Sequence, residues 1–247
     1  MMSLKPFQKV KLLLVVIAIL FAWCYQRANT EPEITRHGLK PMTASIAQAC
    51  SLEGDCIDGV LLLQGQFTIF SKEVLEDFFL ENNLTFGDVE YICFDSPGGE
   101  NSFGIYLGTE IANNKINTCV ADAYYVAGEL TSELSESNEA TICASMCPFT
   151  YMSGNERIML GKSTEFLYHS SQSTIGVCGF CVYTFTDKRS KDQIMNLLLS
   201  YKEKGSRPIS EIEKLIDVTF SIPHEKIAPM TYEQLAKYNV VTQFESL

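Results

Sequence analysis

The stretch VEYICFDSPGGE, residues 89–100, places an apolar run directly before a glycine turn. The run over 89–94 is rich in β-branched and aromatic residues, which predicts a buried strand. The turn SPGG closes that strand, and the residues from about Ser102 to Asn113 have the composition of a helix. A strand, a tight turn and a helix in this order are typical of an α/β domain.

The same alternation continues on both sides of this stretch. We expect further strands over 60–69, 117–122 and 165–169, and helices over 71–82 and 188–204. The sequence therefore predicts an α/β fold.

Composition and charge limit the function classes. The chain has 247 residues, of which 46% are hydrophobic, and a net charge of −11. We expect one globular domain over 51–247, which is long enough to bury a sizeable core. Four of the 19 basic residues precede the first acidic residue, Glu31, so the rest of the chain has 15 basic and 30 acidic residues and lacks the basic clusters that phosphate binding needs. Nucleic-acid binding is therefore excluded.

The N-terminus predicts export. An uncharged run, LLLVVIAILFAWCY over 12–25, follows three lysines, which indicates a signal anchor or a signal peptide over 1–29. A polar linker with two prolines is expected over 30–50. Bulky residues after the apolar run favour a retained membrane anchor with the domain exported, and secretion after cleavage is the alternative.

Nine cysteines agree with an oxidising compartment. Cys50 and Cys56 could close a small loop. Cys143 and Cys147 lie one turn apart on a predicted helix, where their side chains diverge. We therefore expect each of them to pair with another segment, and Cys119 is a natural partner.

Two further cysteines, Cys178 and Cys181, could form a local disulfide, a redox pair or half of a zinc site. Cys93 has the position of a core residue inside a strand. Structural disulfides are favoured over metal binding because a zinc site would need two close pairs, and no metal site is predicted.

Three segments carry residue types suited to acyl transfer. Gly98 and Gly99 leave backbone N–H groups uncovered between a strand and a helix. Ser145 lies in a helix predicted over 143–154, and His169 ends the strand predicted over 165–169. A serine, a histidine base and backbone donors are the minimum set for nucleophilic catalysis.

The order of these motifs resembles the Clp protease proteolytic subunit and its relatives in the crotonase-like superfamily. The resemblance continues through the helix predicted over 188–204, the segment PISEIEKLID over 208–217 and the closing segment MTYEQLAKYNVV over 230–241. It covers roughly residues 55 to 245. The cysteines beside the serine make the chain most similar to the exported branch of predicted periplasmic proteins.

The resemblance implies a fold of repeated strand-strand-helix units and the activity of a serine peptidase on peptides or unfolded segments. It makes Ser145 the nucleophile and His169 the general base, and it places the oxyanion hole at Gly98, Gly99 and the Met146 backbone. It also implies a homo-oligomer that contacts through the helix over 188–204, and no cofactor.

The third member of the family's triad departs from the pattern. Counting from the flanking motifs places the family's aspartate at Ile227 or at Thr219, and neither is acidic. Asp217 and Glu225 are the nearby alternatives. An inactive oligomeric scaffold or binding module at the membrane is therefore the rival function. An acyl-CoA-handling enzyme would share the glycine turn without needing Ser145 or His169.

Overall fold

The computed structural model describes residues 40–131, 141–169, 172–177, 181–186, 188–203, 211–222 and 226–245. The predicted anchor over 1–29 and the first part of the predicted linker, over 30–39, lie outside these residues. Among the helices of the described ranges, none is long and apolar enough to cross a membrane.

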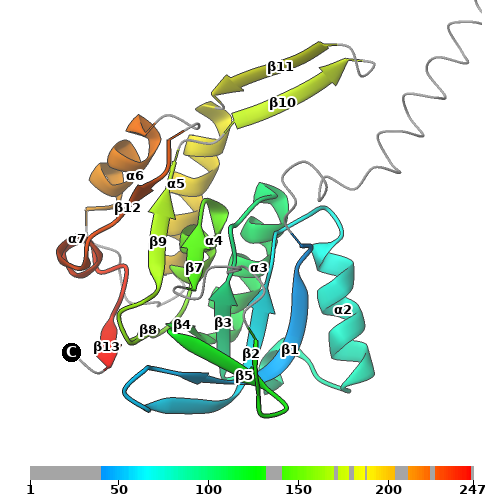
Figure 1. Cartoon of the computed structure of the whole chain (residues 1–247). Coiled ribbons are helices and arrows are strands. Elements are labelled where there is room, and N and C mark those ends of the chain that lie inside the picture. The colour runs from blue at the N-terminus through cyan, green and yellow to red at the C-terminus, as the bar shows by residue number, and fades with distance from the viewer. Residues whose placement is uncertain are drawn as a thin grey trace, which may run out of the picture.

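The fold is α/β, as predicted, and is built around a mixed sheet of eight strands in the order β13-β8-β4-β3-β2-β1-β5-β6 (Figure 1). The strands from β13 to β2 are parallel, and the pairs from β2 to β6 are antiparallel. Their bounds are β1 Thr43–Cys50, β2 Cys56–Gln64, β3 Tyr91–Asp95, β4 Asn117–Ala121, β5 Ala123–Val126, β6 Glu129–Thr131, β8 Arg157–Leu160 and β13 Gln243–Glu245.

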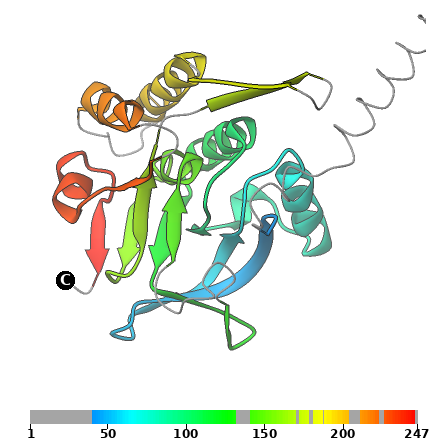
Figure 2. The same cartoon turned by 45° about the horizontal axis from the view of Figure 1, so that its top comes forward.

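The remaining strands of the described residues form two smaller sheets. One has the order β12-β9-β7, with β7 Ile142–Ala144, β9 Glu165–Tyr168 and β12 Ala228–Pro229. The other is the hairpin of β10 Gln172–Val177 and β11 Cys181–Thr186, which extends away from the rest of the molecule in both views (Figures 1 and 2).

Helices follow the strands as the sequence predicts, with one exception. The helices are α2 Ser71–Glu81, α3 Asn101–Asn114, α4 Met146–Tyr151, α5 Lys188–Glu203, α6 Ile212–Ser221 and α7 Tyr232–Lys237, with the 3-10 turn η2 Phe86–Asp88. The expectations for α2, α3 and α5 are confirmed within two residues. The helix expected over 143–154 is wrong at its start, because residues 142–144 form β7 and the chain turns at Ser145 before α4 begins.

The core lies on both faces of the large sheet, since side chains alternate along a strand. Leu61 and Leu63 of β2 pack into the larger cluster with the helices, whereas Val60 and Leu62 pack into a second cluster formed by strand residues. The buried Arg157 side chain donates to the carbonyls of Asn239 and Val240 at 2.8 Å each. These bonds hold the C-terminal segment beside β8.

The second part of the predicted linker is instead an integral strand. Residues 43–50 form β1, which pairs with β2 on one side and β5 on the other. The polar composition misled the prediction because several β1 side chains face outward, while Ala47, Ala49 and Cys50 are buried. The domain therefore includes residues before position 51.

Three disulfides join described residues, and they suggest an oxidising, extracytoplasmic location. Cys50–Cys56 closes the β1–β2 hairpin, which confirms the expected small loop. Cys93–Cys119 links β3 to β4 with a Cα–Cα distance of 4.3 Å. The expectations that Cys93 is a plain core residue and that Cys119 pairs with Cys143 or Cys147 are therefore wrong.

The third disulfide joins Cys143 to Cys147, with a Cα–Cα distance of 5.2 Å. Our expectation that each of them pairs with another segment is wrong, because it assumed a continuous helix. Cys143 lies in a strand and Cys147 in the following helix, so the turn between them brings the sulfurs together. Cys178 lies outside the described residues, as does the side chain of Cys181.

Candidate functional site

Three parallel segments, namely the chain leaving β3, β7 and β9, end at the same side of the molecule. The predicted site residues follow these ends. The chain leaving β3 bonds to β7 through Ser96 N–H to Ile142 O (2.7 Å) and Ala144 N–H to Ser96 O (2.9 Å). On its other side β7 pairs in parallel with β9. The carboxyl ends of parallel strands share one edge, so the residues that follow these three segments converge.

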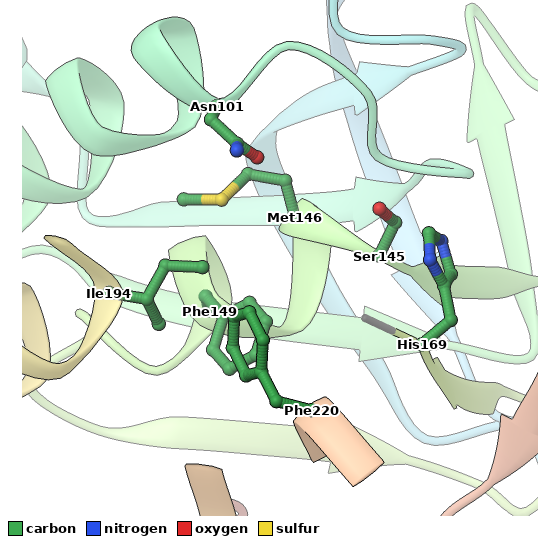
Figure 3. A pocket seen from close by; sticks show the side chains of 7 residues that line it. All are labelled: Asn101, Ser145, Met146, Phe149, His169, Ile194 and Phe220. Atoms are coloured by element: carbon green, nitrogen blue, oxygen red, sulfur yellow. The ribbon is translucent and has the colours of Figure 1, made fainter. Parts of the chain in front are cut away.

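A pocket lies at this edge. Its lining consists of Asn101, Ser145, Met146, Phe149, His169, Ile194 and Phe220 (Figure 3). Ser145 and His169 are both half-buried, which leaves them open to a ligand that enters the pocket. The side chains of Ser145 and His169 lie next to each other in the close view of the pocket (Figure 3). The structure thus brings together the predicted nucleophile and the predicted base.

Ser145 occupies the turn between β7 and α4 rather than the middle of a helix. Its backbone has φ 57° and ψ −109°, a conformation that a residue with a side chain rarely adopts. Its N–H donates to Leu167 O at 2.9 Å, which fixes the turn against β9. A serine on a sharp strand-to-helix turn presents its hydroxyl clear of both elements.

The glycine turn packs against the Ser145 turn. A Cβ on Gly98 would overlap Ala144 O and would lie 2.6 Å from Met146 N. The Gly98 N–H itself donates to the hydroxyl of Ser96 at 3.0 Å. Within the described chain, the N–H groups of Gly99 and Met146 donate no hydrogen bond. Gly98 therefore allows the close approach, and Gly99 and Met146 retain the donors.

A buried carboxylate, which the sequence analysis missed, fixes the start of β7. Asp95 accepts from the Gln64 side-chain amide at 2.8 Å and from Ile142 N–H at 3.1 Å. Burial raises the pKa of Asp95, and the two hydrogen bonds oppose that rise. Its place at the end of β3, one residue before SPGG, is the sequence signal that could have identified it.

Of the two acids predicted to orient His169, the structure describes Asp217. Asp217 on α6 accepts from Lys191 Nζ at 2.6 Å, its side chain is 69% exposed, and it does not line the pocket. Glu225 lies outside the described residues. The β12–β9 ladder ends at the pair of Ala228 with Tyr168, so Ile227 and His169 are the residues that follow it on the two segments. Ile227 is exposed and does not line the pocket.

The remaining pocket wall is apolar and was not predicted. Phe149, Ile194 and Phe220 come from α4, α5 and α6, and Asn101 begins α3. Phe149 lies four residues after Ser145, so the spacing could have indicated that both reach one pocket. Among the described residues, no group of three or more histidine, cysteine or acidic side chains could hold a metal ion.

A scan of protein-family models finds none that matches this chain. A search of curated proteins likewise finds no similar sequence.

Proposed function

We propose that this protein is an exported serine peptidase with a fold like that of the Clp protease proteolytic subunit and the crotonase-like superfamily. One observation carries the proposal. Ser145, on a positive-φ turn, lines the same pocket as His169 and Met146, and the glycine turn packs against the Ser145 turn. This set of groups suits acyl transfer without a cofactor.

The proposed reaction assigns one step to each group. Ser145 Oγ attacks the carbonyl carbon of the scissile bond while His169 accepts the hydroxyl proton. The N–H groups of Gly99 and Met146 donate to the oxyanion that forms. His169 then returns the proton to the leaving amine, which leaves an acyl-enzyme on Ser145. Water, deprotonated by His169, hydrolyses that ester and restores the free serine.

The pocket walls indicate the substrate class. Met146, Phe149, Ile194 and Phe220 offer apolar surface next to the serine, which suits an apolar side chain on the acyl side of the scissile bond. The half-buried Ser145 accommodates an extended peptide or an unfolded segment more readily than a folded surface. Peptides or unfolded proteins are therefore the proposed partners.

Labelling with a fluorophosphonate tests this function directly. The full chain, purified in detergent with its disulfides intact, is incubated with the probe, and mass spectrometry locates the adduct. We expect an adduct on Ser145 that Ser145→Ala and His169→Ala abolish. Ser221→Ala is the matched control, because Ser221 is an exposed serine on α6 whose hydroxyl donates to Val218 O, and it should leave labelling unchanged. A folded wild-type protein without an adduct contradicts the proposal.

An inactive scaffold is the second candidate, and the position of Ile227 favours it. The resemblance places the orienting aspartate of the family at Ile227 or at Thr219, and Ile227, which is 59% exposed, follows the pair of Ala228 with Tyr168 on the side of His169. A carboxylate there would favour the protonated imidazole. For a peptidase, Ile227→Asp should move the pH of half-maximal labelling upward by a few tenths to about one unit, whereas Ile227→Asn should not. For a scaffold, neither variant is labelled.

The proposal extends to the assembly and the membrane. Residues 1–29 would anchor the exported domain, with cleavage and secretion as the alternative. A homo-oligomer would form through α5, on which Leu199 is 45% exposed. Light scattering of the purified chain, compared with Leu199→Glu, tests the assembly. A mass equal to one chain in both samples contradicts it.

A further inference from the structure

The Cys143–Cys147 disulfide encloses Ser145, the proposed nucleophile, whose conformation matters for the proposed chemistry. Cys143 is in β7, Cys147 is in the first turn of α4, and Ser145 lies midway between them. Both cysteine side chains are fully buried. The bridge therefore closes a five-residue loop around the proposed nucleophile, on the side of the chain that faces the core.

The conformation of Ser145 needs external support. A residue with a side chain at φ 57° and ψ −109° is strained, and such strain persists only where the surrounding structure fixes it. Glycine, which would adopt this backbone more readily, cannot supply a nucleophile.

The support on the two sides of Ser145 differs in kind. Before it, β7 is hydrogen-bonded to Ser96 on one side and to β9 on the other. After it, the six buried residues of α4 are joined to other elements by side-chain hydrogen bonds at the far end of the helix, from Thr118 Oγ1 to Tyr151 O at 2.7 Å and from Thr150 Oγ1 to Gly104 O at 3.3 Å. Short helices depend on packing rather than on their own hydrogen bonds. The disulfide is the covalent link from the well-held strand to the short helix.

We infer that Cys143 and Cys147 form a positioning element for the proposed nucleophile. Their bridge holds Ser145 at positive φ, so that its side chain stays in the pocket with His169 and the Met146 N–H stays next to the glycine turn. This inference rests on the proposed role of Ser145. It assigns the bridge a function beyond general stability.

The other two disulfides provide matched controls in the same chain. Cys50–Cys56 closes a hairpin and Cys93–Cys119 joins two sheet strands, and none of these four residues lines the pocket. We compare full-length wild type with Cys143→Ala/Cys147→Ala, Cys50→Ala/Cys56→Ala and Cys93→Ala/Cys119→Ala. The measurements are the maximal rate of fluorophosphonate labelling of Ser145, the probe concentration at half-maximal rate, and the thermal midpoint.

We expect removal of the Cys143–Cys147 bridge to lower the maximal labelling rate by about tenfold to a hundredfold, since small displacements of reacting groups have effects of this size. The half-saturating probe concentration should change less than threefold, because the apolar wall remains. The control pairs should lower the thermal midpoint, most for the longer Cys93–Cys119 loop, yet keep the labelling rate within about threefold of wild type well below the midpoint.

Two outcomes overturn the inference while leaving the proposed function intact. In one, wild type and the Cys143→Ala/Cys147→Ala variant are labelled at the same rate. In the other, all three pairs lose labelling in proportion to their loss of stability. If the alanine pair does not fold, Cys143→Val/Cys147→Ala, which keeps more buried volume in the strand, is measured instead. A folded wild type without any adduct overturns the proposed function itself, and the inference with it.

Discussion

Two turns meet at the candidate site, and they reach the same kind of backbone by different means. Residues 96–100 leave β3 and enter α3, and residues 144–147 leave β7 and enter α4. The first turn reaches positive φ with glycines, at 77° for Gly98 and 130° for Gly99. The second reaches it with a serine.

The difference follows from what each turn must present. The first turn offers only backbone groups, so it needs no side chain, and the absence of one allows close packing against the Ser145 turn. The second turn must present a hydroxyl, so it cannot use glycine. Neighbouring contacts and the Cys143–Cys147 disulfide hold the serine in its strained conformation instead. The pair shows how a site divides shape and chemistry between two strand-to-helix turns.

The largest effect should come from filling the first turn. Gly98→Ala adds a Cβ that overlaps Ala144 O and approaches Met146 N to 2.6 Å, at a φ of 77°. The Ser145 turn must then shift, and misplacement of one oxyanion donor costs about a hundredfold or more in rate. We expect fluorophosphonate labelling to fall by that factor.

Gly128→Ala is the control for this substitution. Gly128 also has positive φ, at 84°, but a Cβ there meets no atom within 4 Å. Both variants therefore carry the backbone penalty, and only Gly98→Ala carries the clash. Equal labelling of the two variants would show that the close approach of the two turns is irrelevant to the site.

A smaller effect should appear on stability when the second turn receives a glycine. Ser145→Gly and Ser145→Ala both lack the hydroxyl, so neither should be labelled, and their difference isolates the backbone. Relief of the strained φ and ψ should make Ser145→Gly about 1 kcal/mol more stable than Ser145→Ala in urea unfolding.

Lys115 provides the comparison for the glycine substitution. It also has positive φ, but its φ 55° and ψ 36° lie in the ordinary left-handed region, whereas the ψ of Ser145 is −109°. The difference in the free energy of unfolding between Lys115→Gly and Lys115→Ala should therefore be smaller than the difference between Ser145→Gly and Ser145→Ala. An equal or larger gain at Lys115 would mean that Ser145 carries no unusual strain.

The sequence was informative where a local pattern determines the structure. The apolar run over 89–94, the glycine turn and the periodic helices over 71–82 and 188–204 led to the α/β class and to the correct position of α3. The strand expected over 165–169 also placed His169 at the end of a strand, and the structure shows that this strand, β9, pairs with β7, which precedes Ser145.

The errors occurred where long-range contacts override local pattern. The segment around Ser145 has the spacing of a helix, but pairing of residues 142–144 with β9 makes it a strand and forces the turn. The wrong helix then hid the Cys143–Cys147 bridge. The pairing of Ala228 with Tyr168, next to His169, follows from the register of β12 on β9, which no local pattern of residues 226–230 determines.

The smallest effect tests Asp95, the carboxylate that connects the two turns by accepting from Ile142 N–H. Because burial raises its pKa, its contribution to folding is greatest when it is protonated in both states, and declines as the pH rises through the raised value. Wild type should therefore lose stability relative to Asp95→Asn as the pH rises from about 4, by at most about 1.4 kcal/mol per pH unit.

Urea unfolding from pH 4 to pH 8 measures this difference, and Asp58→Asn is the matched control. Asp58 also accepts from a glutamine amide, at 2.7 Å from Gln48 Nε2, but at the exposed surface. We expect the unfolding free energy of wild type minus that of Asp95→Asn to fall as the pH rises, and to fall by more than the corresponding difference for Asp58→Asn. A difference that rises with pH would mean that the hydrogen bonds from Gln64 and Ile142 outweigh burial. The carboxylate would then hold the start of β7 most strongly when ionised, and the second turn would depend on charge as well as on its disulfide.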